Sequence, residues 1–312
     1  VARGMGKCCV SGAGAINVDY KTRTVEIEGI TLKEGDFISL NGTTGEVYKG
    51  KVETKAAEVS GDFAALMDLC NKYTKLNVRT NADTPHDAEV ARAFGASGIG
   101  LCRTEHMFFD AEKIVAMREM ILSPDVEGRR KALAKLLPYQ KADFKGIFKA
   151  MDGCPVNVRL LDPPLHEFVP HDAKGQEEMA KAMGVTVQEI KKRVESLCEH
   201  NPMLGHRGCR LGNTYPEITE MQTQAILGAA IELKKEGYDP HPEIMVPLTG
   251  ILYEFEAQEK VIRDAAAALF EKEGMEIPFK VGTMIEIPRA ALTANRIASR
   301  AEYFSFGTND LT

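Results

Sequence analysis

Short apolar segments alternate with helical segments from about residue 58 to the end of this 312-residue chain. Seven segments have the character of buried strands: LNVRTN, GIGLCR, NVRLLD, GHRGCRL, EIMVPL, KVGTMIEIP and YFSFG. Apolar runs of this length, each preceded by a helical stretch, are typical of a parallel sheet whose strands are joined by helices. The count and spacing predict an α/β fold, a (β/α)₈ TIM barrel that lacks its last unit. A doubly wound open sheet is the alternative, because counting strands does not exclude it.

Helix signals between these strands support the alternation. Thr84 followed by Pro85 predicts a capped helix start, and Gly95 predicts the end of the same helix. Thr186 and Glu189 have the spacing of a capping box. Apolar residues at helical spacing over residues 63–73 and a stretch around residues 111–122 predict two further helices.

The first 57 residues have the pattern of β structure instead. TRTVEIEG alternates polar residues with Val25 and Ile27, and DFISLNGTTGEVYKG predicts two strands around a turn at residues 41–45. We therefore expect two domains, a small β-rich one over residues 1–57 and the truncated barrel over residues 58–312.

Composition excludes several kinds of partner. The net charge is −6 with a pI of about 5.8, and no dense run of Lys and Arg occurs, which argues against nucleic acid or an anionic membrane. No apolar stretch approaches the roughly 20 residues of a membrane span. The seven Cys are odd in number and lack CxxC spacing, so we expect reduced thiols in a reducing compartment. The seven His lack HExxH spacing, and His166 and His206 near strand ends are interpreted as structural.

Charged residues recur where the predicted strands end. Parallel strands bring their carboxyl ends to one edge of a sheet, which is where α/β barrels build their sites. Arg offers paired donors that match carboxylate or phosphate, and carboxylates supply the hard oxygen ligands that Mg²⁺ prefers. The pattern predicts a pocket for a small, doubly anionic substrate. The residues at these strand ends are Asn81, Arg103, Arg159, Arg207, Glu286 and Asp310.

The last nine residues, FSFGTNDLT, illustrate this arrangement. An apolar strand ends at Gly307, and Thr308, Asn309 and Asp310 then present oxygen-bearing side chains in a row. Such a cluster suits the polar edge of a site. An ordinary Asx turn is the preferred explanation of this stretch if it is considered alone.

Each charged candidate also has a simpler interpretation. The alternative for Arg103 is a surface residue paired with Glu105, and the alternative for Arg159 is a pair with Asp162 only. Glu286 lies within an apolar strand, where a carboxylate must be paired or bind a metal to offset its desolvation.

Several long motifs resemble one family. GIGLCRTEHMFF, VNVRLLDPPLHEFVP, NPMLGHRGCRLG, GTMIEIPRAAL and YFSFGTNDLT closely resemble the phosphoenolpyruvate-utilising enzymes, and VARGMGKCCVSG resembles the end of their phosphohistidine motif. The resemblance covers essentially the whole chain. It implies that residues 1–57 are the C-terminal part of a swivelling phosphohistidine domain. Residues 58–312 would then be a phosphoenolpyruvate/pyruvate-binding barrel that is truncated at its C-terminus.

The resemblance also implies roles for individual residues. Arg103 and Arg159 match substrate-binding arginines, and Arg207 matches an arginine near the transferred phosphoryl group. Glu286 and Asp310 match ligands of Mg²⁺ and contacts of the substrate. The loop after the last strand adds three substrate contacts, which are Gly307, Thr308 and Asn309.

The reaction that the resemblance implies converts pyruvate, ATP and phosphate to phosphoenolpyruvate, AMP and diphosphate, and the reverse. It would proceed through a phosphohistidine carrier and a Mg²⁺-stabilised enolate of pyruvate. The family's carrier His, its acid/base Cys and its ATP-binding domain match no residue here. We therefore expect a chain that is cut at both ends and inactive alone, with no catalytic acid/base or nucleophile of its own.

The resemblance further implies a homodimer for the intact enzyme and an intracellular location, in the cytoplasm or in a plastid or other organelle. Phosphoenolpyruvate synthase and the first enzyme of the sugar phosphotransferase system belong to the same family and remain alternatives. A metal-dependent lyase or aldolase acting on pyruvate is more remote, because it needs no phosphohistidine carrier. A non-catalytic interaction fragment is the last alternative.

Overall fold

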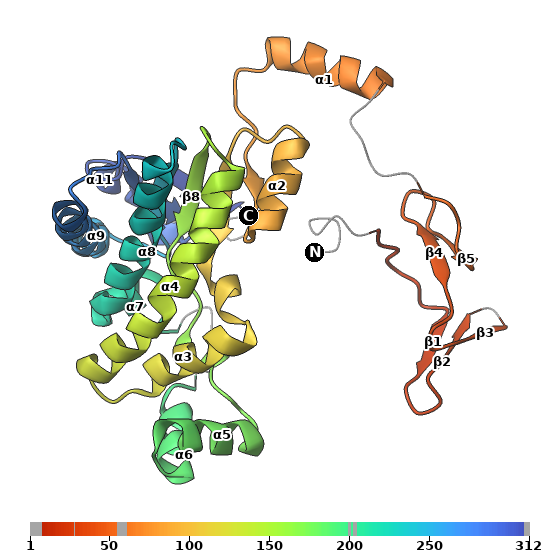
Figure 1. Cartoon of the computed structure of the whole chain (residues 1–312), viewed down its shortest axis with the longest axis horizontal. Helices are drawn as coiled ribbons and strands as arrows, with labels where there is room; N and C mark the ends of the chain where they lie inside the picture. The colour runs from red at the N-terminus through yellow and green to blue at the C-terminus, as the bar shows by residue number, and fades with distance from the viewer. Residues whose placement is uncertain (1–7, 28, 55–60, 199–200, 202–204, 309–312) are drawn as a thin grey trace. The chain divides into compact units, whose positions relative to one another are not determined.

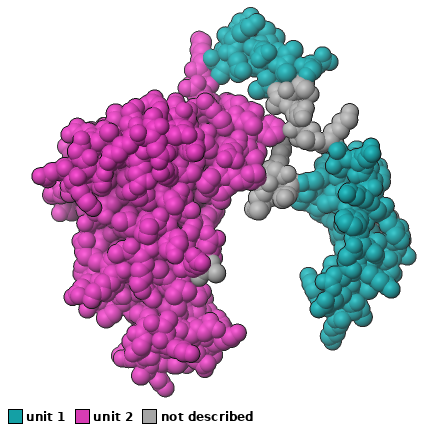
Figure 2. All heavy atoms as spheres, in the orientation of Figure 1, with its two compact units in different colours: residues 1–74 teal, residues 75–312 magenta. Residues whose placement is uncertain are grey.

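The computed structural model describes residues 8–27, 29–54, 61–198, 201 and 205–308. The chain divides into two compact units, residues 1–74 and residues 75–312 (Figure 2). The predicted domain boundary between residues 57 and 58 stays a prediction.

The first unit contains short antiparallel strands and one helix (Figure 1). β1 (Ile16–Asp19), β2 (Thr24–Ile27) and β3 (Ile30–Lys33) form one sheet in that order, and β4 (Ile38–Asn41) pairs with β5 (Glu46–Lys49). The β4–β5 turn is closed by the Asn41 carbonyl, which accepts a hydrogen bond from the Gly45 N–H at 2.9 Å. Gly45 has a φ of 78°, which favours glycine. The predicted strands of this region and the helix α1 (Gly61–Tyr73) are confirmed.

The second unit is built on one parallel sheet of six strands, in the described part of the chain. The strands are β6 (Thr80–Asn81), β7 (Ile99–Arg103), β8 (Pro155–Arg159), β9 (His241–Val246), β10 (Lys280–Ile285) and β11 (Phe304–Phe306). They lie side by side in the order in which they occur along the chain. A doubly wound sheet would reverse its strand order at a switch point, and this sheet does not. The curled parallel sheet is that of a (β/α)₈ barrel-type domain.

Helices pack along the outside of this sheet (Figure 1). They are α2 (Pro85–Ala93), α4 (Val126–Ala150), α8 (Pro216–Lys235), α9 (Leu252–Glu273), α10 (Pro288–Leu292) and α11 (Ala294–Ile297). The helix α3 (Ala111–Leu122) packs against α4. Val156, Ile244 and Val281 of three neighbouring strands are fully buried in the core shared with α4 and α8. Each such side chain contributes roughly 1.5–3 kcal/mol on burial. This core holds the strands in register and so positions the residues at their carboxyl ends.

The helix signals in the sequence are confirmed. The Thr84 side chain accepts a hydrogen bond from the Asp87 N–H at 3.1 Å and caps α2. Thr186 and Glu189 form the predicted capping box of α6 (Val187–Ser196). None of the helices in the described ranges is long and apolar enough to cross a membrane.

The excursion between β8 and α8 differs from the prediction. It contains the short 3₁₀ helix η2 (Leu165–Glu167), then α5 (Ala173–Met183), α6 and α7 (Gly208–Thr214). The segment GHRGCRL was predicted as a strand, and this prediction is wrong because α7 begins inside it. Gly208 has a φ of 58°, which is incompatible with a strand. Its N–H donates to the Asp162 carbonyl at 3.0 Å instead of to a strand ladder. The sheet therefore has six described strands rather than seven.

Candidate functional site

Arg103 and Arg159 end neighbouring strands at the carboxyl edge of the sheet. Arg103 is the last residue of β7, Arg159 is the last residue of β8, and the two are paired in the parallel register. Glu286 comes directly after β10. The structure thus brings three of the predicted site residues to one edge of the sheet, as expected from their strand-end positions.

Arg159 is held by two buried carboxylates. Its Nη2 lies 2.5 Å from Oε1 of Glu105, and its Nη1 lies 3.2 Å from Oδ2 of Asp162. Burial opposes the charge of the guanidinium, but the negative charges of Glu105, Asp162 and Glu286 outweigh that effect and raise the pKa of Arg159. The side chain is therefore cationic at any working pH. The simpler interpretation, a pair with Asp162 only, is too narrow because Glu105 takes part as well.

Three buried polar atoms of this cluster have no hydrogen-bond partner among the described residues. They are Nε of Arg159, Oε2 of Glu105 and Oδ1 of Asp162. A buried donor or acceptor without a partner costs about 1–3 kcal/mol. The cluster therefore offers both a donor and acceptors to a bound polar ligand.

Asp162 also joins the cluster to Arg207. Its Oδ2 accepts a hydrogen bond from Nη2 of Arg207 at 2.5 Å, and the side chains are 3% and 13% exposed. Arg207 is the N-cap residue of α7, so it reaches the site from a helix start and not from a strand end. Gly208 follows in a left-handed conformation, and a Cβ there would lie 2.7 Å from Cβ of Leu248. The close approach that brings Arg207 to Asp162 therefore requires glycine at this position.

Glu286 is a buried carboxylate, with 8% of the residue exposed. Its Oε1 accepts a hydrogen bond from the Leu248 N–H at 2.6 Å. Leu248 itself has a φ of 58°, which is uncommon for a non-glycine residue. Such values persist where the surrounding structure imposes them, and they cluster at functional sites. The loop after β9 is thus shaped around this carboxylate.

Glu286 has the chemistry of a Mg²⁺ ligand, because its carboxylate is a hard oxygen donor in a buried position. The second predicted ligand, Asp310, and the predicted substrate contact Asn309 lie outside the described residues. Across the described ranges, no group of three or more His, Cys, Asp or Glu is placed to hold a metal ion. Glu286 is therefore suited to be one ligand of the ion. The second ligand, and with it the complete metal site, stays a prediction.

Arg103 is oriented by Asp83 and not by Glu105. Its backbone N–H donates to Oδ1 of Asp83 at 2.7 Å, and its Nη1 lies 3.9 Å from Oδ2 of the same side chain. Nδ1 of His106 lies 2.7 Å from that Oδ2. The simpler interpretation of Arg103 as the partner of Glu105 is wrong, because Glu105 faces Arg159. Asp83 was missed, although it lies only two residues after the end of β6 and so close to a strand end like the others.

The loop that follows β11 begins beside Glu286. The Gly307 N–H donates to the carbonyl of Ile285 at 3.0 Å, and Gly307 is buried whereas Thr308 is exposed. Asn81 is exposed at the end of β6. His206 has Nε2 at 3.0 Å from Oγ1 of Thr214, as a structural histidine would.

Comparison with known proteins relates this geometry to a family. A model described as "PEP-utilising enzyme, PEP-binding domain" matches residues 57–312. Pyruvate, phosphate dikinase of Clostridium symbiosum is 56% identical over 313 residues, and that of Giardia intestinalis is 57% identical over 312 residues. The chloroplastic pyruvate, phosphate dikinase 1 of Oryza sativa subsp. japonica is 55% identical over 315 residues. Each alignment covers 100% of this chain.

The alignments cover 36%, 35% and 33% of these three relatives, so the chain spans about a third of their length. The family model by itself covers most of the chain, including every described residue of the parallel sheet. The chain therefore belongs to the phosphoenolpyruvate-utilising enzymes, and residues 57–312 match their phosphoenolpyruvate-binding domain.

Proposed function

We propose that this chain carries the pyruvate/phosphoenolpyruvate site of a phosphotransferase. The enzyme converts pyruvate, ATP and phosphate to phosphoenolpyruvate, AMP and diphosphate, and the reverse. Relatives that are 55–57% identical over the whole chain are named pyruvate, phosphate dikinase, which supports this reaction over others of the family. Residues 1–57 belong, in this proposal, to a swivelling phosphohistidine domain, and the barrel begins at residue 58.

The observation that carries the proposal is the cluster of Arg159, Asp162 and Arg207 beside Glu286. The buried guanidinium of Arg159 and the partly buried one of Arg207 share one carboxylate oxygen, at 3.2 and 2.5 Å, so their planes are held in place before any ligand binds. Preorganised donors of this kind stabilise negative charge that develops during a reaction. Phosphoryl transfer to or from an enolate depends chiefly on such positioning and charge neutralisation.

Each residue has a distinct role in the proposed reaction. Arg159 and Arg103 bind the carboxylate and the enolate oxygen of the substrate, and Arg207 faces the phosphoryl group. Glu286 and Asp310 hold Mg²⁺, which when bound polarises the substrate oxygens and lowers the free energy of the enolate. The backbone and side chains of the last loop then orient the substrate, through Gly307, Thr308 and Asn309.

Binding of oxalate tests the site, since oxalate has the planar, dianionic shape of the pyruvate enolate. The protein at its full natural length should bind oxalate only with Mg²⁺ present, and Arg159→Lys should weaken that binding. Oxalate binding that is independent of Mg²⁺, or equal in the variant, would contradict the assignment of this cluster.

Isotope labelling separates the proposed reaction from its alternatives. A dikinase transfers labelled inorganic phosphate into diphosphate, whereas phosphoenolpyruvate synthase and the sugar phosphotransferase enzyme do not. A lyase or aldolase would exchange the methyl protons of pyruvate without any phosphohistidine. Absence of label from diphosphate in an otherwise active enzyme would rule out the dikinase.

A further inference from the structure

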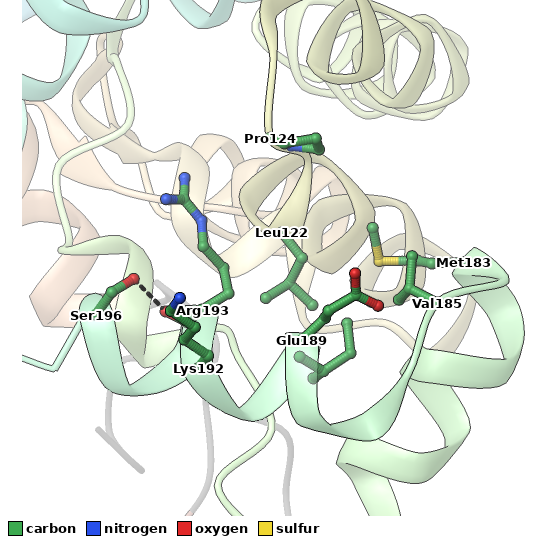
Figure 3. A pocket seen from close by; sticks show the side chains of 9 residues that line it. Leu122, Pro124, Met183, Val185, Glu189, Lys192, Arg193 and Ser196 are labelled. Carbon is green, nitrogen blue, oxygen red and sulfur yellow. Dashed lines mark hydrogen bonds between the residues drawn. The ribbon is translucent and has the colours of Figure 1, made fainter.

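A cavity lies away from the candidate site, between the end of α3 and the helix α6 (Figure 3). Its volume is about 420 Å³, within the range of small-molecule sites in proteins. α5 and α6 pack against α3, apart from the sheet (Figure 1). None of the residues that line the cavity belongs to the candidate site.

One part of the cavity wall is apolar. Leu122 and Ile190 are 5% and 2% exposed and form a fixed wall, while Val185 at the rim is 38% exposed. Pro124 and Met183 complete this part of the lining. Met adapts its shape to an occupant, so this wall suits an apolar body whose outline is not rigidly specified.

The charged side chains that line the cavity have a net positive charge. Lys192 and Arg193 contribute two positive charges and Glu189 one negative charge. Glu189 and Arg193 lie four residues apart on α6, the spacing at which a glutamate and a basic residue commonly pair. Glu189 instead accepts hydrogen bonds at 2.8 Å from both the N–H and the hydroxyl of Thr186. These bonds engage the carboxylate in the capping box of α6 and hold the pKa of Glu189 below its usual value.

Arg193 is left without an acidic partner in the described part of the chain. Its Nε is buried and has no hydrogen-bond acceptor among those residues. Figure 3 shows its side chain rising from α6 with the guanidinium directed away from Lys192, and the Glu189 carboxylate on the side of Val185. An anion at Arg193 would satisfy a buried donor and neutralise an unpaired charge.

We propose that this cavity binds a small amphipathic organic anion. Its apolar body packs against Leu122, Met183 and Ile190, and its carboxylate pairs with Arg193, with Lys192 as a second cation at the rim. The inference is independent of the proposed function, because it concerns other residues and a different ligand class.

Octanoate is a suitable probe, since it combines one carboxylate with a flexible apolar chain. Isothermal titration calorimetry on the protein at its full natural length should detect octanoate, and should detect 1-octanol and acetate at least about tenfold more weakly. Equal affinity for octanol, or no octanoate binding, would overturn the proposal.

Two substitutions on α6 locate the site. Arg193→Leu should weaken octanoate binding at least about tenfold, as expected for loss of a charge-assisted hydrogen bond. Lys191→Leu is the matched control, because Lys191 is exposed on the same helix and does not line the cavity. Equal binding in Arg193→Leu and in the unsubstituted protein would contradict the proposal.

A third variant keeps the test decisive if Arg193→Leu folds poorly. Val185→Glu places a negative charge at the exposed rim, where Val185 is 38% exposed, and should weaken octanoate binding by repulsion. Thermal unfolding of each variant shows that the fold is retained. Undiminished octanoate binding by folded Val185→Glu would place the ligand elsewhere.

Discussion

Oδ2 of Asp162 lies 2.5 Å from Nη2 of Arg207, although 45 residues of chain separate the two. The carboxylate is 3% exposed, so it is removed from water and depends on its arginine partners for stabilisation. This pair joins the two ends of the segment between β8 and α8 that contains α5 and α6. The same carboxylate holds Arg159, so the start of the excursion, its end and the end of β8 meet at one charged group.

Asp162→Asn should impair the enzyme without unfolding it. Asn has the same shape but no charge, so it holds Arg159 and Arg207 less firmly in the geometry that meets the substrate. We expect kcat/KM for pyruvate to fall by roughly 10–100-fold, as for loss of hydrogen bonds to charged groups of about 1.5–3 kcal/mol. Asp239→Asn is the control, because Asp239 is exposed and precedes the amino end of β9. Equal kinetics in both variants would make Asp162 a purely structural residue.

Arg159→Lys should not be conservative. Lysine keeps the charge but loses the planar fork that contacts Glu105 and Asp162 at the same time. We expect a loss of about 2–4 kcal/mol in transition-state stabilisation, measured as kcat/KM. Arg130→Lys, at an arginine that is 54% exposed, should change little. A decrease of less than about threefold in Arg159→Lys would exclude this side chain from the reaction.

Glu286→Gln should abolish Mg²⁺-dependent formation of phosphoenolpyruvate while the fold survives. Glutamine still offers an oxygen to the Leu248 N–H, but it lacks the charge that a hard cation requires. Mg²⁺-dependent binding of oxalate should be lost in this variant and in Asp310→Asn. Glu273→Gln, at a surface pair with Lys235, serves as the control. Unchanged Mg²⁺ affinity in Glu286→Gln would remove that residue from the metal site.

The strand ends were predictable from the sequence because each apolar run ends close to its charged residue. Arg103 ends its strand as predicted, whereas β8 already ends at Arg159 and β10 just before Glu286, earlier than the predicted strands NVRLLD and KVGTMIEIP. The helix caps were predictable for the same reason, since Thr186 and Glu189 interact within one turn.

The partners of these residues were not predictable in the same way. Glu105 and Arg159 are 54 residues apart, and only the packed sheet brings them together. The strand predicted over GHRGCRL failed because its apolar residues are few and Gly208 adopts a left-handed conformation set by contacts with Asp162 and the loop after β9. Such tertiary contacts override a local pattern.

The buried pair of Arg129 and Glu217 should contribute more to the free energy of unfolding than the more exposed pair of Arg130 and Glu220. Nε of Arg129 lies 2.5 Å from Oε1 of Glu217, and the side chains are 9% and 3% exposed. Glu217→Ala leaves a buried arginine unpaired, so the free energy of unfolding should fall by about 3–5 kcal/mol. Glu220→Ala removes a pair with Arg130, which is 54% exposed, and should cost about 0–1 kcal/mol. Urea unfolding measures both, and equal losses would contradict the role of burial.

Cysteine alkylation should distinguish two groups of thiols in the native protein. The exposed cysteines are Cys8, Cys9, Cys70 and Cys198, and the buried ones are Cys102, Cys154 and Cys209. Burial is the main cause that raises the pKa of Cys209 to about 12, and burial also raises that of Cys102 well above its usual value. Because the thiolate is the reactive form, Cys209 should react far more slowly than an exposed thiol near pH 8.

The measurement is iodoacetamide labelling at about pH 8, read residue by residue through mass spectrometry of the digested protein. Cys70 and Cys198 should be labelled in the native state, whereas Cys102 and Cys209 should be labelled only after denaturation. A group whose pKa is raised in the folded state stays protonated until the pH approaches that value, so a rise to about pH 10 should leave Cys209 largely unlabelled. Labelling of native Cys209 as fast as Cys70 would show that the loop after β9, whose Leu248 carbonyl accepts the Cys209 thiol at 3.1 Å, does not cover it.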